Sequence, residues 1–300
     1  MKLSEVIKAV GRGTLYRECE FDQLILFGIP YEEKKRNIAF IGGISFIPDF
    51  SKVDLAGVIC TEEVKEEIKD VFQGGILVGE NPKGIFLTFY NRILNKKNEE
   101  KLSHPTKIGG GSQIHKTAII APNNVEIGDN VTIGPFTVIE EETNIADNVV
   151  IGAHCTIGVP GFFYFEEGGK KTRVVNVGGV SIGRNAEIDS HCVVARAVFS
   201  GDTIIGENAK LDNFVFLAHD VQIGAGAIVA AGAIFGGYAS VDENMFLGLQ
   251  STVVPNIKIG PDGTVSAGAV VTKNVPPNTH VSGNFAIEHS RFIRNLKGIK

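Results

Sequence analysis

One histidine in this sequence stands next to a carboxylate in a way that suits proton transfer. His219 is followed by Asp220 in the segment Leu217-Ala218-His219-Asp220. An imidazole titrates near neutral pH, so it can accept a proton from an attacking nucleophile, and a neighbouring carboxylate could orient its ring. The alternative is a solvated surface histidine beside a solvated aspartate. Residue type alone does not decide between the two.

Metal, P-loop and nucleic-acid chemistry have little support in the sequence. No two of the seven histidines have metal-ligand spacing, and the four cysteines form no C-x-x-C pair, so we expect neither a metal site nor a disulfide framework. The phosphate-binding pattern G-x-x-x-x-G-K-[ST] is absent. With 29 basic and 34 acidic residues the net charge is −5, which argues against nucleic acid as a partner.

The sequence also predicts a compartment. No apolar run approaches the ~20 residues that cross a bilayer, so we expect no transmembrane segment. Met1-Lys2-Leu3-Ser4 leads directly into Glu5 with no apolar region behind it, so we expect no secretory signal. A cytoplasmic protein with reduced cysteines is therefore the expectation.

A six-residue period in the sequence predicts the kind of structure that holds His219. Aliphatic or aromatic anchors recur every six positions in three series, namely Ile127, Ile133, Ile139, Ile145, Ile151 and Ile157; Ile182, Ile188 and Val194; and Ile205, Leu211, Leu217, Ile223, Val229, Phe235, Val241, Leu247, Val253, Ile259, Val265 and Val271. The residue after an anchor is often glycine, and these positions account for ten of the 36 glycines in 300 residues. The period fits neither an α-helix nor a simple strand. It predicts a parallel β-helix in which three hexapeptides close one triangular coil.

This register makes specific predictions about the surroundings of His219. The anchor and the residue four positions later should point inward, so His219, two residues after Leu217, should point outward. Gly237 should lie directly above His219 on the next coil, where the missing side chain would leave room for a substrate. The polar face predicted from this stacking consists of His219, Asp220, Tyr238 and Asn256.

One segment interrupts the repeat for about one coil. Residues 160–171 are first aromatic and then rich in glycine and charge. Because they break the repeat, we expect them to leave the stack as an external loop. Long ordered loops are disproportionately functional, so we expect a functional role for this one. A harmless insertion is the alternative.

The regions before and after the repeats lack the six-residue period and show other patterns. Within residues 1–100 the patterns predict helices over Leu3–Val10, Glu62–Phe72 and Ile85–Leu94 and strands over Asn37–Phe46, Val53–Cys60 and Gly75–Val78. Residues 95–106 read as a linker, Pro276-Pro277 as the end of the β-helix, and residues 286–297 as a short basic helix. We therefore expect a mainly β protein with a small α/β domain (1–100), a left-handed parallel β-helix of hexapeptide repeats (106–276) and a helical C-terminal tail (277–300).

The chain resembles the UDP-3-O-acylglucosamine N-acyltransferase family of hexapeptide-repeat acyltransferases, which acts in lipid A synthesis. The likeness covers both domains and rests on these segments: Ile38-Ala39-Phe40 with Phe46, Ala56 to Cys60, Val78-Gly79-Glu80-Asn81-Pro82, Pro160-Gly161-Phe162-Phe163-Tyr164, Asp202 to Gly206, Leu211-Asp212-Asn213, and Leu217 to Gly224. Hexapeptide repeats alone indicate only a superfamily. Their combination with this N-terminal region is more specific.

The resemblance implies an N-acyltransferase that moves an acyl group from a phosphopantetheine thioester to the 2-amine of a UDP-linked glucosamine. The donor would be 3-hydroxyacyl-acyl carrier protein, with no covalently bound cofactor. The assembly would be a homotrimer with active sites between neighbouring β-helices. His219 would be the general base, oriented by Asp220, and the backbone N–H of Gly237 would stabilise the oxyanion. Phe40 and Phe46 would stack on uracil. Phe162, Tyr164, Asn213, Tyr238 and Asn256 complete the implied substrate-binding set.

Departures from the family pattern keep other functions open. Phe46 replaces the usual tyrosine, Asn256 stands where a second histidine is common, and the C-terminal helix is short. Residues 270–284 resemble the end of coenzyme A-dependent sugar acetyltransferases. An acetyl-coenzyme A-dependent N-acetyltransferase acting on a nucleotide-linked amino sugar for surface polysaccharide is therefore the first alternative. A non-catalytic nucleotide-sugar-binding scaffold is the second.

Overall fold

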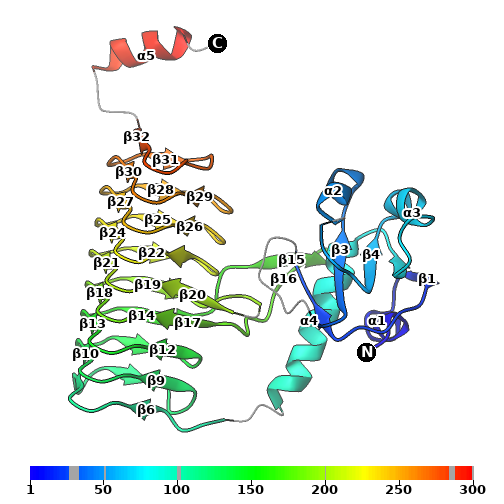
Figure 1. Cartoon of the computed structure of the whole chain (residues 1–300), viewed down its shortest axis with the longest axis horizontal. Helices are drawn as coiled ribbons and strands as arrows, with labels where there is room; N and C mark the ends of the chain where they lie inside the picture. The colour runs from blue at the N-terminus through cyan, green and yellow to red at the C-terminus, as the bar shows by residue number, and fades with distance from the viewer. Residues whose placement is uncertain (27–33, 51, 100–102, 200, 284–287, 299–300) are drawn as a thin grey trace. The chain divides into compact units, whose positions relative to one another are not determined.

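The computed structural model describes residues 1–26, 34–50, 52–99, 103–199, 201–283 and 288–298 (Figure 1). The chain divides into two compact units. The smaller unit comprises Met1–Leu102 together with Phe162–Val177, and the larger comprises Ser103–Gly161 together with Gly178–Lys300. His219 belongs to the larger unit.

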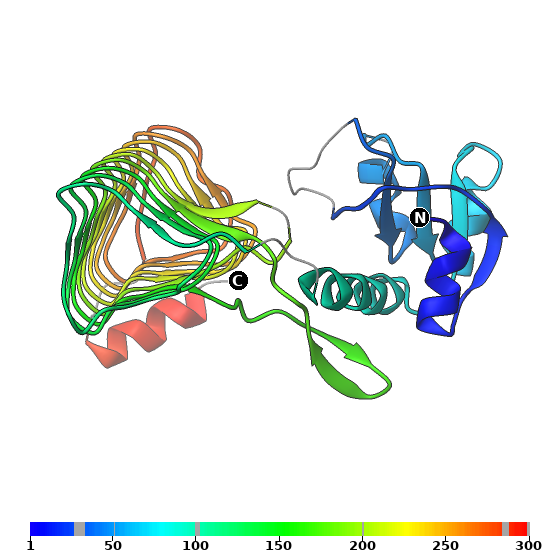
Figure 2. The ribbon, with the colours of Figure 1, turned by 90° about the horizontal axis from the view of Figure 1, so that it is seen from below.

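The larger unit is a left-handed parallel β-helix, as the six-residue period predicts. Anchors eighteen residues apart pair directly, Leu217 with Phe235 and Phe235 with Val253, so consecutive coils stack in register. Viewed along the stack, each coil encloses a triangle (Figure 2). The anchors fill its interior, and Leu217 and Phe235 are both 0% exposed.

Three parallel sheets form the faces of the β-helix. The first face contains β7 (Gln113–Ile114), β10 (Thr132–Ile133), β13 (Val150–Ile151), β18 (Glu187–Ile188), β21 (Lys210–Leu211), β24 (Ile228–Val229), β27 (Phe246–Leu247), β30 (Thr264–Val265) and β32 (His280–Val281). The second face contains β8 (Ile119–Ile120), β11 (Val138–Ile139), β14 (Thr156–Val159), β19 (Val193–Ala195), β22 (Phe216–Leu217), β25 (Ile234–Phe235), β28 (Thr252–Val253) and β31 (Val270–Val271). The third face contains β6 (Lys107–Ile108), β9 (Val125–Ile127), β12 (Thr143–Ile145), β17 (Gly179–Ile182), β20 (Asp202–Ile205), β23 (Gln222–Ile223), β26 (Ser240–Val241) and β29 (Lys258–Ile259).

The turns between faces explain the glycines and asparagines of the repeat. A Cβ added to Gly224, one residue after its anchor, would lie 2.5 Å from the carbonyl carbon of Asp242 on the next coil, so a side chain does not fit there. Other turn positions have left-handed backbone, with φ of 58° at Asn148 and 57° at Asn208. Asparagine tolerates this conformation better than most residues. The tight stacking of coils therefore sets the composition of the turns.

The interruption in the repeat forms a hairpin. β15 (Tyr164–Glu167) and β16 (Lys170–Arg173) pair antiparallel, and the chain re-enters the β-helix at Gly178. The excursion thus ends later than the expected residue 171. Asn91 ties it to the smaller unit, because its side chain donates to Arg173 O (2.9 Å) and accepts from Val175 N (2.9 Å).

The rest of the smaller unit is an α/β sheet with helices. Its sheet has the order β1-β5-β4-β3-β2, in which β1 runs antiparallel to β5 and the other pairs are parallel. The elements are α1 (Leu3–Val10), β1 (Thr14–Arg17), β2 (Gln23–Leu24), β3 (Asn37–Ile41), a 3₁₀ turn (Ile44–Phe46), α2 (Ile47–Phe50), β4 (Gly57–Cys60), α3 (Glu62–Ile68), β5 (Gly75–Val78) and α4 (Pro82–Glu99).

Several expected boundaries were wrong. Strand β3 ends at Ile41, before two glycines and the 3₁₀ turn, β4 begins only at Gly57, and α3 ends at Ile68. Helix α4 continues to Glu99, so the expected linker is helical from residue 95 to 99, and residues 100–102 lie outside the described residues. Strands β1 and β2 were not expected.

The C-terminal end of the β-helix also differs from the expectation. Strand β32 (His280–Val281) pairs with β30, so the β-helix continues past Pro276-Pro277. These prolines occupy a turn, where a missing backbone N–H costs no ladder hydrogen bond. Helix α5 spans His289–Gly298. Residues 286 and 287, with which the expected helix began, and residue 300 lie outside the described residues.

Candidate active site

His219 and Asp220 lie in the turn that joins β22 on the second face to β23 on the third. We call the stack of turns at this edge the His219 corner; it comprises residues 196–199, 218–221, 236–239 and 254–257 and the two ends of the excursion at 158–161 and 178. His219 Nδ1 lies 2.9 Å from Asp220 Oδ2. The two side chains therefore form the histidine–carboxylate pair that the sequence left undecided.

Asp220 is itself held in place by its neighbours. Its Oδ2 accepts a hydrogen bond from Val198 N (3.0 Å), and its own N–H donates to Thr203 Oγ1 (2.9 Å). Asp220 is 9% exposed. Because Nδ1 of His219 faces this fixed carboxylate, a proton taken up by the imidazole during a reaction would bind at Nε2.

The imidazole of His219 is buried between two glycines. A Cβ at Gly237 would lie 2.5 Å from His219 Cε1 and 2.7 Å from Nε2, and a Cβ at Gly161 would lie 2.6 Å from His219 Cβ and 3.1 Å from Cδ2. The exposed fraction of His219 is only 7%. The ring is therefore much less exposed than the sequence register predicts for an outward side chain. The space that Gly237 leaves is filled by the imidazole itself.

Among the other residues expected near His219, Tyr238 makes a direct contact. Its ring meets the imidazole edge-on, with centroids 5.0 Å apart. Asp220, Tyr238 and Asn256 occupy equivalent positions on successive coils, with φ of 60°, 62° and 64°. Asn256 is exposed. The predicted stacking of these three residues is therefore present in the fold.

Asn213 lies at a different corner. It belongs to the turn between β21 and β22, at the opposite end of β22 from His219. Its side-chain amide donates to Asp212 Oδ1 at 2.7 Å, and Asp212 Oδ2 accepts from Ala231 N at 3.1 Å. The structure therefore gives Asn213 a role in turn geometry and does not bring it to the imidazole.

The remaining expected site residues belong to the smaller unit. Phe40 on β3 packs against Phe86 of α4 with ring centroids 5.3 Å apart, while Phe46 in the 3₁₀ turn is 54% exposed. Phe162 is 83% exposed and meets Tyr164 at 4.9 Å. Tyr164 also lies under the Arg173 guanidinium at 4.8 Å.

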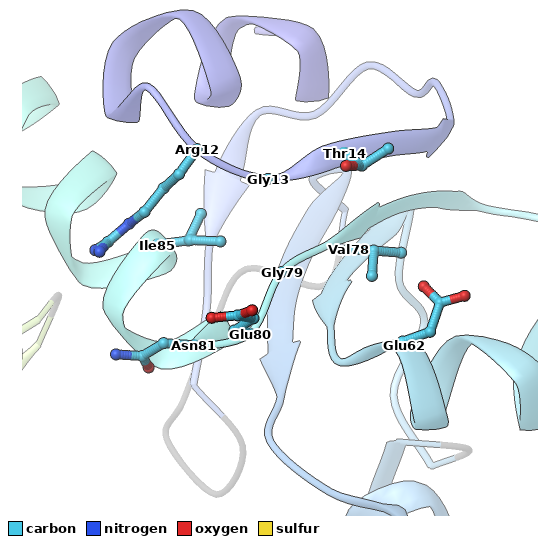
Figure 3. Close-up of a pocket in the computed structure, with 9 residues that line it drawn as sticks. All are labelled: Arg12, Gly13, Thr14, Glu62, Val78, Gly79, Glu80, Asn81 and Ile85. Carbon is cyan, nitrogen blue, oxygen red and sulfur yellow. The ribbon is translucent and has the colours of Figure 1, made fainter.

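The smaller unit contains a hollow that the sequence did not predict (Figure 3). It has a volume of about 450 Å³ and lies where β4 and β5 end, the edge at which parallel sheets commonly bind ligands. Its lining is Arg12, Gly13, Thr14, Glu62, Val78, Gly79, Glu80, Asn81 and Ile85. The hollow thus combines a guanidinium, two carboxylates and an amide.

Sequence reasoning missed the residues that support the pair from outside the hexapeptide register. Gly161 ends the regular coil before the excursion, and Val198 lies in an enlarged turn. The spacing between the anchors Val194 and Ile205 is eleven positions, whereas the regular spacing is six. That irregular spacing was the available signal, and it did not indicate which backbone groups would meet Asp220.

Two further features bear on the class of site. Within the part of the chain that the structure describes, no group of three or more His, Cys, Asp or Glu side chains is placed to bind a metal ion. No helix among the described residues combines the length and apolar character needed to span a bilayer.

Models of known families match the β-helix. The model described as bacterial transferase hexapeptide (six repeats) matches residues 124–158 and 202–237, and the hexapeptide repeat of succinyl-transferase matches residues 238–273. These segments contain His219, Asp220 and Gly237. Hexapeptide repeats therefore occupy residues 124–158 and 202–273 of the chain.

Curated relatives of this hexapeptide-repeat protein include two UDP-3-O-acylglucosamine N-acyltransferases. The relative from Ectopseudomonas mendocina is 30% identical over 103 residues, which is 34% of this chain and 29% of the relative. The relative from Rickettsia typhi is 37% identical over 87 residues, or 29% of this chain and 25% of the relative. The matched segments thus span less than a third of the length of these relatives.

Solved structures similar to this hexapeptide-repeat protein include UDP-N-acetylglucosamine acyltransferases. The Arabidopsis enzyme has a TM-score of 0.46 and 24% identity, and the match covers 64% of this chain and 74% of that one. The Campylobacter jejuni enzyme has a TM-score of 0.45 and 20% identity, covering 63% and 73%.

Proposed function

We propose that this hexapeptide-repeat protein is an N-acyltransferase. It transfers an acyl group from a phosphopantetheine thioester to the 2-amine of a UDP-linked glucosamine, in chemistry like that of lipid A biosynthesis. The observation that carries the proposal is the buried pair of His219 Nδ1 and Asp220 Oδ2, 2.9 Å apart on a rigid coil. The similarity to UDP-3-O-acylglucosamine N-acyltransferases supports the choice of substrates.

The proposed reaction uses the imidazole twice. His219 Nε2 takes a proton from the sugar amine as its nitrogen attacks the thioester carbonyl, which forms the C–N bond and a tetrahedral oxyanion. The backbone N–H of Gly237, beside the ring, is the proposed oxyanion donor. When the intermediate collapses, the C–S bond breaks and the imidazolium returns its proton to the leaving thiolate. Asp220 stabilises the imidazolium between these steps.

The nucleotide is proposed to bind in the smaller unit. Phe46 offers an exposed ring for stacking on uracil, and Phe40 is the second proposed stacking partner. Phe162, Tyr164, Tyr238 and Asn256 are proposed to contact the remainder of the substrates. Stacking needs only a ring, so it survives the phenylalanine at position 46.

A homotrimer in the cytoplasm is the proposed assembly, with the acidic acyl carrier protein as a partner of the basic C-terminal segment. Exposed apolar side chains on the second face support a self-association surface, among them Ile119 (64%), Ile234 (47%) and Val270 (61%). Large exposed apolar patches commonly mark protein interfaces. Active sites would then lie between neighbouring β-helices.

Turnover of defined substrates by the purified protein tests this function. We expect acylation of UDP-3-O-acylglucosamine with 3-hydroxyacyl-acyl carrier protein, and a loss of about 10²–10⁴-fold in kcat for His219→Ala. His115→Ala is the matched control, because His115 is exposed and its Nδ1 bonds Thr117, two residues later, at Oγ1 (2.8 Å) and at the backbone N–H (3.3 Å). Absence of turnover, or equal rates for wild type and His219→Ala, would contradict the proposal.

A second part of the same experiment distinguishes the two candidate acyl donors, acyl carrier protein and coenzyme A. Asn256, exposed at the His219 corner in place of the family's histidine, favours the alternative in which acetyl-coenzyme A acetylates a nucleotide-linked amino sugar. Coenzyme A would then protect the protein against thermal unfolding, because a ligand of the folded state raises its stability by mass action. Binding of UDP without transfer from either donor would indicate a nucleotide-sugar-binding scaffold.

A further inference from the structure

A half-buried arginine at the His219 corner has no place in the mechanism above. Arg196 follows β19, one coil before His219. Its Nε donates to Gly158 O (2.6 Å), its Nη2 donates to Glu141 O (2.9 Å), and its backbone N–H donates to Val159 O (2.9 Å). Arg196 thus holds the end of β14 at two points, Gly158 and Val159, and a turn of the preceding coil at Glu141.

The segment that Arg196 fastens leads directly to the imidazole. Gly158 has φ of +88°, a conformation that glycine adopts readily and most residues do not. Three residues later, Gly161 lies against His219, where even a Cβ would come within 2.6 Å of the histidine Cβ and 3.1 Å of Cγ. The position of residues 158–161 therefore limits where the ring can lie.

The same short segment also supports the other side of the pair. Val198, two residues after Arg196, donates its N–H to Asp220 Oδ2 (3.0 Å), the oxygen that faces His219 Nδ1. Residues 196–198 thus support the pair in two ways. Arg196 bonds the segment that ends at Gly161, which lies against the ring, and Val198 bonds Asp220. A shift of this segment would move both supports together.

The bonding of Arg196 fits a geometric role. Both of its side-chain hydrogen bonds go to main-chain oxygens, of Glu141 and Gly158. A planar guanidinium can bond two carbonyls in fixed directions, which the point charge of a lysine cannot reproduce. Burial lowers the pKa of this guanidinium, while the nearby charges of Glu140 and Glu142 oppose that shift.

We propose that Arg196 is a positioning residue for His219. It holds residues 158–161 against one side of the imidazole, and its own segment holds Asp220 against Nδ1. Tyr238 contacts the imidazole from the next coil, with ring centroids 5.0 Å apart. The inference rests on the proposed function for its catalytic meaning, but the placement of the ring can be measured without turnover.

Arg196→Lys and Gly161→Ala test this role. Arg196→Lys keeps the charge but loses the two-carbonyl geometry, and Gly161→Ala displaces the ring while leaving Arg196 intact. We expect each to lower kcat by about 10- to 100-fold with little change in KM, because small misplacements of a reacting group are costly. We also expect the acid limb of the pH profile of kcat/KM to shift. Arg184→Lys is the matched control, since Arg184 is 59% exposed and pairs with Asp147 at 3.7 Å.

A measurement independent of activity separates this inference from the proposed function. In ¹⁵N-histidine-labelled protein, the ring nitrogen signals lost in His219→Gln identify the imidazole. We expect both test variants to change the tautomer or titration of these signals, and Arg184→Lys to leave them as in wild type. Unchanged signals and unchanged pH profiles in folded Arg196→Lys and Gly161→Ala would overturn the positioning role. If the wild type turns over no substrate, the proposed function fails, while the ring signals still test Arg196.

Discussion

At the scale of single residues, the central feature is that two consecutive side chains meet. His219 and Asp220 are adjacent in the chain, yet Nδ1 and Oδ2 lie 2.9 Å apart because the turn places Asp220 at φ 60°. Val198 N–H then fixes the carboxylate from the previous coil. The pair is therefore a product of local turn geometry and of one contact between coils.

Asp220→Asn tests what the negative charge of Asp220 contributes to His219. Val198 N–H and His219 Nδ1 both meet Asp220 Oδ2, so the amide oxygen of asparagine can take that position and keep both hydrogen bonds. A neutral amide stabilises the imidazolium less than a carboxylate does, so we expect kcat to fall by about 10- to 100-fold. We expect little change in melting temperature, since the shape is conserved. Retention of wild-type kcat would show that the charge of Asp220 does not assist the base.

At the scale of elements, the β-helix alternates buried and exposed positions within each short strand. In β20, Ile205 is 0% exposed and Ile204 is 39% exposed. The inward residue packs in a core shared by successive coils, whereas its neighbour faces outward. The two isoleucines differ in environment and not in type.

Alanine substitution of these two isoleucines measures that difference. We expect Ile205→Ala to lower the free energy of unfolding by about 2–5 kcal/mol, because it removes buried methylenes and leaves a cavity. Ile204→Ala is the matched control and should cost much less. Denaturant unfolding at one fixed protein concentration provides the measurement. Equal losses for the two variants would contradict the assigned register.

The fold was largely predictable at this scale. Anchors such as Leu217 and Phe235 occur at a constant spacing. This repeat can be recognised from the sequence alone, because each coil contacts only its neighbours. The α/β unit was less predictable. Strand β2 has two residues, and a 3₁₀ turn replaces the expected end of β3, so neither had a periodic signal.

At the scale of the whole molecule, one corner of the β-helix carries a ladder of exposed rings. Phe136, His154, His191 and Phe214 stack on successive coils with centroids 5.0 Å apart at each step. Phe136 is 56% and Phe214 is 63% exposed. This ladder fits the surface through which the proposed homotrimer would assemble, because two of its four rings are exposed phenylalanines, a residue type enriched at protein interfaces.

Phe214→Asp tests that assembly. We expect the wild type to have three times the chain mass of 32.1 kDa and the variant to dissociate, because the substitution places a charge in a desolvated contact. Light scattering coupled to gel filtration would give both masses. Tyr16→Asp, at a 49% exposed aromatic on β1, is the control and should stay trimeric. A monomeric wild type, or a trimeric Phe214→Asp, would count against the ladder as the interface.

The six-residue period was enough to predict the coil, its register and the position of His219 within one turn, because such a period corresponds directly to stacked strands. Only the folded chain shows that the imidazole is buried between Gly161 and Gly237 and that Val198 holds Asp220. Gly161 borders the excursion and Val198 lies in the enlarged turn, the two places where the period breaks. Contacts made by such segments depend on how the chain returns to the stack, and that path leaves no periodic trace in the sequence.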